Sequence, residues 1–544
     1  MRIKLITALV FILTASFYIL TLSPSLAWGD GVKLQTEAIT GESFLFSEMP
    51  PQDFTPDAFI FSKVGVAAWD HPLYIMLGRT LVKTFPSANP LWLVNLISAV
   101  FGAASVTVVF LIAHRLTLSI VASAFAAFAL AVSHTFWWHS STPEVYTLFI
   151  FLLLVSYIFF DEYEKSKQNK FLIGSAFFLG LAASNHILAF LALPAFGLYS
   201  FLSKRYPRFE INSLKKFVFL ALGFLLGFSL YIVQFIRVTR ALSINETVGP
   251  ALGSTFLSRL DFFSPTVLGN SLLTYAGFLA FQFGPLGIFL GIFGIRRAFV
   301  NADASPRKAF AFFIVFMLFG IFYRVTDQFA FFLTSYVFFA ILMALGANHF
   351  FTTLRIKPRF ILTFILFLTI LLTPSFYRSV PRLAERNGVD DSFLGIPQIG
   401  VGLRDGFAYY IDPNKRGDFN AYNFGNETLT KLPPNAVVIA EWYTDTDEYF
   451  IFRYFQKVEG LRPDVTILGW PTDDPFMFDS QLVVNAVEDS FPERPVYLAS
   501  LSEKFYAAPK LIEAYCIVPE NNLYRVYEQS ASDSQCLRMD SISP

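Results

Sequence analysis

The sequence has little charge and very little cysteine. Only 15% of its 544 residues are charged, the formal net charge is zero, and there are two cysteines, Cys516 and Cys536. A chain without a basic excess has no field to attract nucleic acid, so nucleic acid is not an expected partner. The two cysteines match no zinc-site spacing. We also find no low-complexity tract and no fixed-period repeat, which argues against fibrous and solenoid classes.

Apolar residues, by contrast, are in excess. Hydrophobic residues make up 54% of the chain, 66 residues are phenylalanine, and the mean hydropathy is +0.52. A single soluble core does not need this much apolar surface, whereas stacked transmembrane helices do. We therefore expect a polytopic α-helical membrane protein whose surroundings are the lipid bilayer.

Apolar runs recur at lengths near the about 20 residues that a helix needs to cross a bilayer. They lie at residues 5–22, 91–112, 117–136, 144–160, 171–202, 217–236, 266–295, 309–323, 328–348 and 360–375. The first run follows a basic N-terminus and is either a signal peptide or, as we favour from its length, a retained helix. The run 171–202 is too long for one span. Basic residues flank it on both sides, so we expect two crossings with a turn near 184–186.

This pattern gives about eleven spans, with the N-terminus inside and the C-terminus outside. Lysine and arginine concentrate in the segments assigned to the inside, as translocation disfavours them. We expect residues 1–375 to form the transmembrane domain, with 23–90 as its first outer loop, and residues 376–544 to form a soluble extracytoplasmic α/β domain. A bacterial inner membrane with the site facing the periplasm is the expected location, and an endoplasmic reticulum membrane is the alternative.

The α/β assignment rests on short strand and helix patterns after residue 376. Residues 437–440, 464–468 and 495–499 are typical of strands, and 447–458 of a helix. The acidic stretch 444–448 is either a metal site or, as we favour, an N-cap followed by first-turn acids that suit the helix dipole. Cys516 and Cys536 lie in this outer domain, where a disulfide is permitted; separately buried thiols are the alternative.

Several ionisable residues fall at the expected outer membrane boundary, where each needs an energetic reason. Asp30 follows the first span between two glycines, which allow positive φ and let its carboxylate project. The others are Asp70, His71, His139, Glu144, His186, Arg324 and Asp327. Plain alternatives exist: a solvated turn for Asp30, a helix start for Glu144, a hydrogen-bonded turn histidine for His186, and an Arg324–Asp327 ion pair.

Several segments together resemble one family. Trp28-Gly29-Asp30, after Pro24, is similar to its first-loop signature, and the stretch from His71-Pro72-Leu73-Tyr74 to Leu77-Gly78-Arg79 to its next element. Further similar blocks are Asn89-Pro90 to Ala99, Glu144-Val145-Tyr146, Asn185-His186, Tyr323-Arg324-Val325-Thr326-Asp327, Asp445-Thr446-Asp447 and Arg462-Pro463-Asp464-Val465. The family is the protein O-mannosyltransferase-like membrane proteins of the GT-C glycosyltransferase superfamily. This chain departs from it in a shortened His-Pro block and a lengthened loop over 38–69.

The resemblance implies a GT-C-like fold and an inverting glycosyltransferase that uses a polyprenyl-phosphate sugar, mannose by expectation. The acceptor would be a hydroxyl on a protein or a glycan. Asp30 would be the catalytic base, with Asp70 and Glu144 as alternative bases. Substrate-binding residues would be Asp70, His71, Arg79, Glu144, Tyr146, His186, Arg324 and Asp327. The resemblance implies no metal and no other cofactor.

Two rival functions remain open. The same fold could transfer its sugar to a lipid or surface glycan instead of a protein. A non-catalytic transporter of lipid-linked glycan is the rival from another class. A transporter should show inverted repeats and broken helices near the midplane, and the sequence shows neither.

Overall fold

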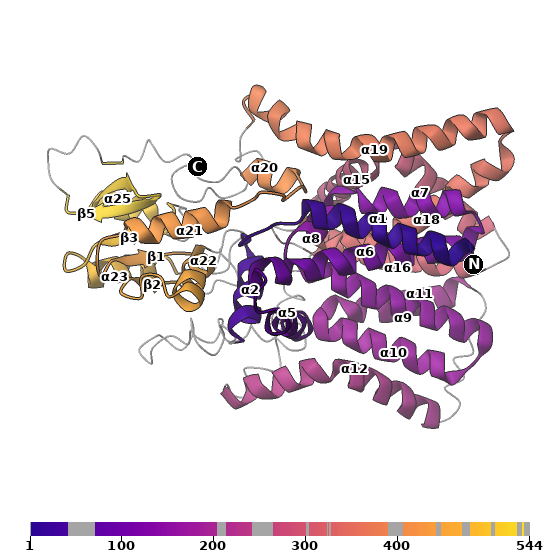
Figure 1. Ribbon diagram of the computed structural model, residues 1–544, viewed down its shortest axis with the longest axis horizontal. Helices are drawn as coiled ribbons and strands as arrows, with labels where there is room; N and C mark the ends of the chain where they lie inside the picture. Colours follow the sequence, from indigo (N-terminus) through magenta and orange to yellow (C-terminus); the bar gives the residue numbers. More distant parts are fainter. Residues whose placement is uncertain are drawn as a thin grey trace.

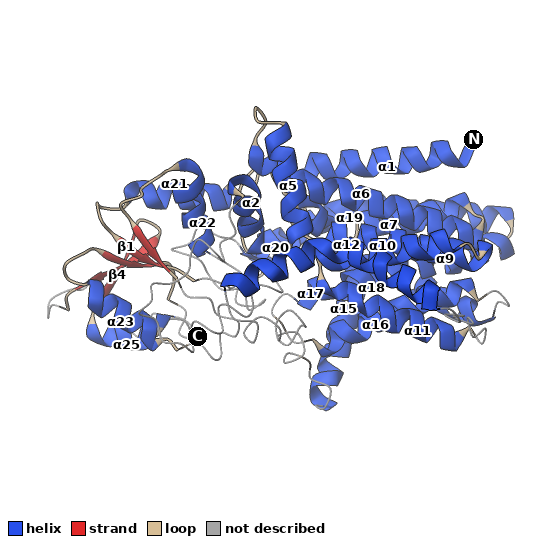
Figure 2. Cartoon of the chain, turned by 90° about the horizontal axis from the view of Figure 1, so that it is seen from below, coloured by secondary structure: helices blue, strands red, loops and turns tan. Residues whose placement is uncertain are grey.

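The computed structural model of the chain is a helical bundle with a small α/β domain at one end (Figures 1 and 2). The structure describes residues 2–41, 71–203, 214–241, 260, 265–300, 304–323, 325, 328–389, 406–441, 448–469, 479–501, 506–529 and 536–537. The N-terminus lies at the end of the bundle away from the sheet (Figure 1).

The bundle is built from apolar helices that follow the predicted runs. They are α1 (Arg2–Thr21), α6 (Pro90–Thr117), α7 (Ile120–Ala131), α8 (His134–Ser141), α9 (Tyr146–Ser166), α10 (Asn169–Asn185), α11 (Ala192–Leu202), α12 (Leu214–Ala241), α15 (Pro265–Val300), α16 (Ser305–Phe322), α17 (Gln328–Phe331), α18 (Leu333–Thr353) and α19 (Ile356–Arg386). Within the described residues, eight helices are long and apolar enough to cross a membrane. They become nine if α7 and α8, bent by 62°, form one span. The chain is therefore an integral membrane protein, while the predicted count of eleven depends on the shorter α10 and α11.

The long run 171–202 turns where its flanking charges predicted. Helix α10 ends at Asn185, His186 follows in an extended conformation, and a 3₁₀ turn, η1 (Ile187–Leu191), leads into α11. The His186 Nδ1 atom accepts a hydrogen bond from the Leu188 amide at 3.1 Å and so caps the turn. The expectation of a hydrogen-bonded turn histidine is confirmed.

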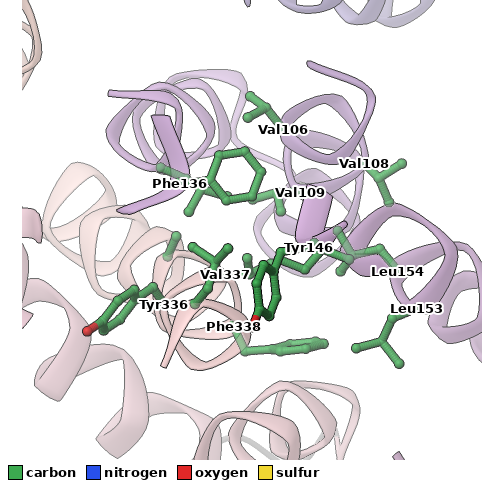
Figure 3. Close-up of a cluster of buried hydrophobic side chains, with 14 of the residues drawn as sticks. Val106, Val108, Val109, Phe136, Tyr146, Leu153, Leu154, Tyr336, Val337 and Phe338 are labelled. Carbon is green, nitrogen blue, oxygen red and sulfur yellow. The ribbon is translucent and has the colours of Figure 1, made fainter. Parts of the chain in front are cut away.

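Helix α18 occupies the centre of the bundle. Within their apolar windows, 83% of α18 residues are buried, compared with 17% in α1 and α19, which lie at the periphery. Figure 3 shows Val337 and Phe338 of α18 packed with Tyr146 of α9 and Phe136 of α8. In lipid such packing holds helices together, because apolar burial alone does not favour a helix neighbour over a lipid tail.

A buried cluster of charged side chains connects α16 and α9 at the end of the bundle away from the sheet. Lys308 of α16 is fully buried, and its ammonium lies 3.1 Å from Asp161 and 2.5 Å from Glu164, both on α9. The aromatic rings of Tyr157 and Tyr199 lie 5.0 and 5.3 Å from the same ammonium. The cluster thus fixes α16 to α9 through paired charges.

The C-terminal domain carries a five-stranded sheet in the order β2-β1-β3-β5-β4. Its elements are α20 (Gly406–Ile411), α21 (Asn420–Lys431), β1 (Val437–Ile439), α22 (Glu448–Tyr454), a π-helical turn η3 (Phe455–Glu459), β2 (Thr466–Leu468), α23 (Gln481–Ser490), β3 (Val496–Leu498), α25 (Ala508–Ala514), β4 (Cys516–Glu520) and β5 (Leu523–Tyr527). Strands β2, β1 and β3 are parallel and are the three predicted from sequence; β5 and β4 run antiparallel and were not predicted. The expected helix 447–458 appears as α22 and η3.

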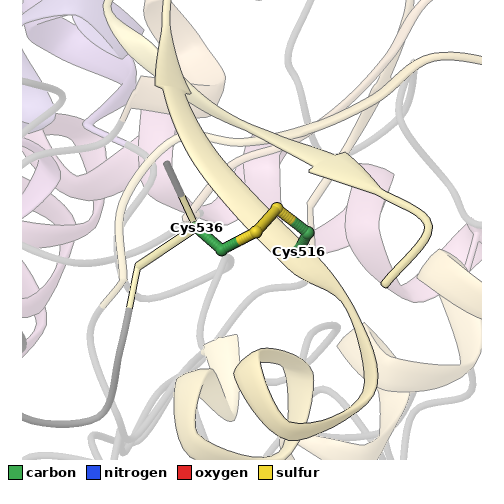
Figure 4. Close-up of a disulfide and its surroundings, with 2 residues drawn as sticks. All are labelled: Cys516 and Cys536. Carbon is green, nitrogen blue, oxygen red and sulfur yellow. A yellow bond between two sulfur atoms is a disulfide. The ribbon is translucent and has the colours of Figure 1, made fainter. Parts of the chain in front are cut away.

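A disulfide ties the end of the described chain to this sheet. Cys516, the first residue of β4, is bonded to Cys536, with Cα atoms 5.1 Å apart (Figure 4). The Leu537 amide also donates to the carbonyl of Ile517 at 2.9 Å. The predicted disulfide is confirmed, and the alternative of two separate thiols is wrong.

Two short helices lie between the bundle and the sheet, namely α2 (Asp30–Thr40) and α5 (Pro72–Thr84) (Figure 1). Val32 of α2 and Trp28 just before it belong to the hydrophobic core of the C-terminal domain, and the Trp28 ring lies 5.5 Å from Phe424 of α21. Helix α2 thus packs against both parts of the molecule.

A second connection between the two parts involves residues 409–415. The Lys415 amide donates to the carbonyl of Thr21, the last residue of α1, at 2.9 Å. The Trp138 indole donates to the Tyr409 carbonyl at 3.2 Å, and His134 Nε2 donates to the Tyr410 carbonyl at 2.6 Å. This segment is therefore joined to α1 and α8 at the end of the bundle that faces the sheet.

Candidate active site

Asp30 is the first residue of α2, at the end of the bundle that faces the sheet, and its side chain is exposed. The preceding Gly29 has φ 67°, a value that glycine adopts without strain, and this turns the chain from the first span into α2. A carboxylate at a helix N-terminus is favoured by the helix dipole. Of the two glycines that allow positive φ beside Asp30, Gly29 adopts it and Gly31 is helical.

Gly31 is required for space instead. A Cβ atom at this position would lie 2.9 Å from Cβ of Ala27 and 2.9 Å from Cγ of Pro143. The start of α2 therefore rests on the loop between α8 and α9, one residue before Glu144. This packing sets the residue after Asp30 against the residue before Glu144, although the two segments are far apart in the sequence.

Glu144 is half-buried and lies two residues before α9 begins at Tyr146. The predicted helix start is therefore displaced, and Glu144 belongs to the loop. Ser98 of α6 fixes that loop, because its hydroxyl accepts from the Glu144 amide at 2.9 Å and donates to the Glu144 carbonyl at 3.0 Å. The Tyr74 hydroxyl of α5 lies 3.1 Å from Ser98 Oγ and joins α5 to the same loop.

His71 precedes α5 and lies against the α10 turn. Its Nδ1 atom is 2.6 Å from the carbonyl of Asn185, and since a carbonyl only accepts, Nδ1 donates. Neutral His71 therefore has its lone pair on Nε2. Burial lowers the pKa of His71 to about 4; the hydrogen bond to Asn185 opposes this shift, and the charge of Lys33 adds to it.

The His71 ring stacks on His186, with centroids 5.4 Å apart and an interplanar angle of 24°. His186 holds the opposite tautomer when neutral, because its Nδ1 accepts from Leu188 and its proton is then on Nε2. The pair thus presents one basic nitrogen and one N–H donor side by side. The Asn185 side chain donates to the Val145 carbonyl at 2.8 Å and fixes this pair to the Glu144 loop.

Tyr146 continues the aromatic contacts from His186 to α8. Its ring lies 5.2 Å from His186 and 5.0 Å from His139, which is edge-on to it. His139 in turn lies 5.0 Å from Trp138, whose ring is 6.0 Å from Tyr410. A continuous row of rings therefore connects His71 with the segment that leads to the C-terminal domain.

The remaining predicted site residues are placed as follows. Arg79 lies two turns along α5, and its guanidinium is directly against Gly41, which follows α2 at the end opposite Asp30. Asp70, Arg324 and Asp327 lie outside the described residues. Across the part of the chain that the structure describes, no group of three or more His, Cys, Asp or Glu side chains could hold a metal ion.

Two buried side-chain amides that position α2 were not predicted from the sequence. Gln35 of α2 and Asn95 of α6 are fully buried and hydrogen-bonded to each other and to the chain that precedes Asp30. Buried Lys415, which donates to the carbonyls of Tyr409 and Asp412, was also missed. Asn95 is a polar residue one turn into an otherwise apolar span. This placement was the signal that could have identified it.

The chain is similar to known proteins in sequence and in fold. Residues 70–208 match the family described as the protein O-mannosyl-transferase TMEM260 N-terminal domain. The protein O-mannosyl-transferase TMEM260 of Mus musculus is 28% identical over 180 residues, which is 32% of this chain and 22% of the mouse protein. The match thus spans about a fifth of that relative.

Among solved structures, ArnT from Cupriavidus metallidurans bound to undecaprenyl phosphate aligns with a TM-score of 0.56 at 13% identity. The alignment covers 96% of this chain and 98% of ArnT. The chain has the fold of ArnT. The same protein in its apo state aligns with a TM-score of 0.54 at 14% identity, covering 95% of this chain and 97% of ArnT.

The predicted resemblance to the protein O-mannosyltransferase-like membrane proteins is confirmed by the two sequence matches. The TMEM260 match begins at residue 70 and so includes His71, Glu144, Tyr146 and His186. Asp30 precedes that match.

Proposed function

We propose that this protein transfers a sugar, mannose, from a polyprenyl-phosphate donor to an acceptor hydroxyl of protein serine or threonine. The observation that carries this proposal is the packing of Gly31, next to Asp30, on Pro143, next to Glu144, at one end of an ArnT-fold bundle. His71, Tyr146 and His186 lie in contact at the same end. A donor with its tail in the bilayer and its phosphate at the surface would reach this end.

In the proposed reaction Asp30 takes the proton of the acceptor hydroxyl as its oxygen attacks the anomeric carbon. The bond from that carbon to the phosphate oxygen breaks, and the phosphate leaves with the electron pair. A positioned base of this kind contributes about 10²- to 10⁴-fold. The negative charge of Asp30 also favours the oxocarbenium-like sugar of the transition state. A single displacement inverts the anomeric configuration.

The test is to incubate the purified full-length protein with radiolabelled polyprenyl-phosphate mannose and a serine- and threonine-rich acceptor protein. We expect label in protein, released polyprenyl phosphate, and inverted configuration at the anomeric carbon. Label in a lipid or glycan product would favour the alternative acceptor. Movement of intact donor between leaflets without release of polyprenyl phosphate would identify a transporter and overturn the proposal. The Asp30→Asn variant should lose most of the transfer. Its matched control is Asp489→Asn, an exposed change on α23.

We also propose that the sheet domain and the site face away from the cytoplasm. The concentration of lysine and arginine in the opposite loops supports this orientation, as does the Cys516–Cys536 disulfide, a bond favoured in oxidising compartments. A C-terminal reporter that works only in the cytoplasm should remain silent. A strong cytoplasmic signal would contradict the orientation.

A further inference from the structure

Helices α15 and α18 lie side by side and run in the same direction towards the end of the bundle away from the sheet. The Phe283 ring of α15 lies 5.7 Å from Phe339 of α18, and further along both helices the Phe293 ring lies 5.0 Å from His349. Helix α19 follows α18 after a short turn and lies at the edge of the bundle (Figure 1). The last turns of α15 and α18 and the first turn of α19 therefore meet at one corner.

Five cationic side chains, here called the basic corner, lie where these helices meet. They are Arg296 and Arg297 near the end of α15, and Arg355, Lys357 and Arg359 at the start of α19. Four of the five are exposed, and Arg297 is half-buried. Like charges gathered in this way repel one another, so an anion placed among them would be stabilising.

The helices that carry the basic corner offer it no acidic partner of their own. The described residues of α15 and α18 include no aspartate or glutamate, and the one acid of α19, Glu385, is at the opposite end of that helix. Asp303, which follows α15, lies outside the described residues. Counted against five cations, it still leaves an excess of positive charge.

The corner that α9 and α16 form at the same end of the bundle is different, because its charges are paired. Three acids are matched there by three cations at distances of 2.5 to 3.5 Å, namely Asp161, Glu162 and Glu164 with Arg115, Lys165 and Lys308. Positive charge that only set the orientation of the chain could lie anywhere at this end. The unequal distribution therefore indicates an anionic partner at the basic corner.

Exposed apolar side chains on α15 and α19 lead along each helix to a cation of this corner. On α15, exposed Ile292 precedes Arg296 by four positions and so shares its face. On α19, Lys357 is followed at helical spacing by exposed Ile361 and Phe364. Apolar side chains exposed on membrane-spanning helices face lipid tails. The cations therefore lie at the level where a lipid headgroup would be.

An anionic phospholipid has both features that this corner can accommodate, a negatively charged phosphate and apolar tails. Arginine binds phosphate oxygens through two parallel N–H donors, and lysine binds them as a point charge. The Arg296 guanidinium lies 5.8 Å from the Phe293 ring, a cation–π contact that holds it beside the apolar surface. Basic sites between spanning helices are typical binding sites for anionic headgroups.

We propose that the basic corner binds an anionic phospholipid of the leaflet farther from the sheet domain. The headgroup phosphate lies between the end of α15 and the start of α19, and the tails lie along Ile292, Ile361 and Phe364. Such a lipid bridges α15 and α19, which is the more peripheral of the two helices. In the proposed orientation this is the cytoplasmic leaflet, opposite the proposed site of sugar transfer.

The experiment titrates dioctanoyl phosphatidylglycerol into delipidated, detergent-solubilised full-length protein and measures affinity and thermal stability. The variant Arg355→Gln/Lys357→Gln/Arg359→Gln should bind at least about tenfold more weakly, because it loses three basic residues beside the headgroup. The matched control Lys165→Gln/Lys167→Gln/Lys170→Gln removes the same charge from the other corner and should bind within a few-fold of the unmodified protein. Arg355→Lys/Arg359→Lys keeps the charge and should do the same.

The unmodified protein provides tests that do not depend on how any variant folds. It should bind phosphatidylglycerol more tightly than zwitterionic phosphatidylcholine, and raising the salt concentration should weaken the binding because ions screen exposed charges. Equal affinity for the two lipids would overturn the proposal. Equal losses in the two triple variants would also overturn it, since the attraction would then belong to the basic surface as a whole.

A soluble anionic partner, such as an acidic protein, is the competing occupant, and the apolar side chains distinguish it from a lipid. Ile361→Ser/Phe364→Ser leaves every cation in place and should weaken phosphatidylglycerol binding several-fold. Soluble glycerol phosphate, which has the headgroup charge without the tails, should compete poorly. Unchanged lipid affinity in Ile361→Ser/Phe364→Ser, or competition by glycerol phosphate equal to that by the lipid, would overturn the assignment to a phospholipid.

Discussion

Gln35 of α2 donates its side-chain amide to the Asn95 side-chain oxygen of α6 at 2.8 Å. The same two amides hold the chain before Asp30, since the Ala27 amide donates to Gln35 Oε1 at 3.0 Å and Asn95 donates to the Ser23 carbonyl at 2.9 Å. Asp30 is thus positioned by buried side chains that themselves take no part in the proposed chemistry.

Replacing either amide should therefore damage both the fold and the reaction. We expect Gln35→Leu and Asn95→Leu each to destabilise the protein by about 1–3 kcal/mol, because each leaves buried partners unsatisfied. Thermal unfolding in detergent measures this, and sugar transfer should fall in parallel. The double variant should cost less than the two single losses added together; full additivity would contradict a shared network.

Asp30→Asn should abolish most of the sugar transfer. The change preserves shape and removes the basic oxygen, so we expect turnover to fall by at least about 10²-fold. Melting temperature and undecaprenyl phosphate affinity should change little, because Asp30 is exposed. If Asp30→Asn turns over normally while Glu144→Gln is inactive, the base has been assigned to the wrong residue.

Gly31→Ala should destabilise the site by steric overlap. The added methyl would meet Ala27 and Pro143 at 2.9 Å, and overpacking of this kind costs about 1–3 kcal/mol. Gly197→Ala on α11 is the matched control, since no atom lies within 4 Å of its added methyl. That change should be neutral or stabilising by up to about 1 kcal/mol. Equal melting temperatures for the two variants would contradict the close packing of Gly31 on Ala27 and Pro143.

Acidification should destabilise the protein in part through His71. Its pKa in the fold, about 4, is below the ordinary value of 6.5, so the unfolded chain binds the proton first. Stability from this residue is complete above about pH 7 and is lost as the pH falls from 6.5 towards 4. His71→Gln should therefore show a shallower loss of melting temperature over that interval, with His349→Gln on α18 as the control for losing a histidine elsewhere. An unchanged slope in His71→Gln would contradict this account.

Lys308→Met should be far more harmful than Lys165→Met. Removing buried Lys308 leaves the Asp161 and Glu164 carboxylates without their shared cation, and we expect a loss of about 3 kcal/mol or more. Lys165 pairs with the same Asp161 at 2.7 Å, but 53% of its side chain is exposed, so its loss should cost less than about 1 kcal/mol. Comparable melting temperatures for the two variants would show that burial adds nothing to this pair.

Much of the membrane architecture could be predicted because its causes are local. Apolar runs of about 20 residues indicate membrane-spanning helices. The basic residues beside 171–202 were enough to predict the turn at Asn185 and His186. The 62° bend between α7 and α8 was not predicted, since no proline or glycine marks Val132 and Ser133. Strands β4 and β5 were missed because their pairing depends on the distant β3.

The candidate site could be predicted only in part, because its contacts join distant segments. The sequence indicated Asp30, His71, Glu144 and His186 as site residues. It did not indicate which of them would be in contact. The stack of His71 on His186 follows from a hydrogen bond to Asn185 that lies 114 positions away. Gln35 gave no signal, since its burial depends on the packing of α2 against α6.

The hydrogen bond from Lys415 to Thr21 has a consequence for biosynthesis. Thr21 ends α1, whereas residues 409–415 are made only after α19. The partners of this segment on α1 and α8 are therefore translated well before it and remain without it until residues 409–415 have been made. This end of the molecule therefore assembles after its helices have been inserted. In a chain arrested after α19, residues 409–415 would not yet be present to pack against α1 and α8.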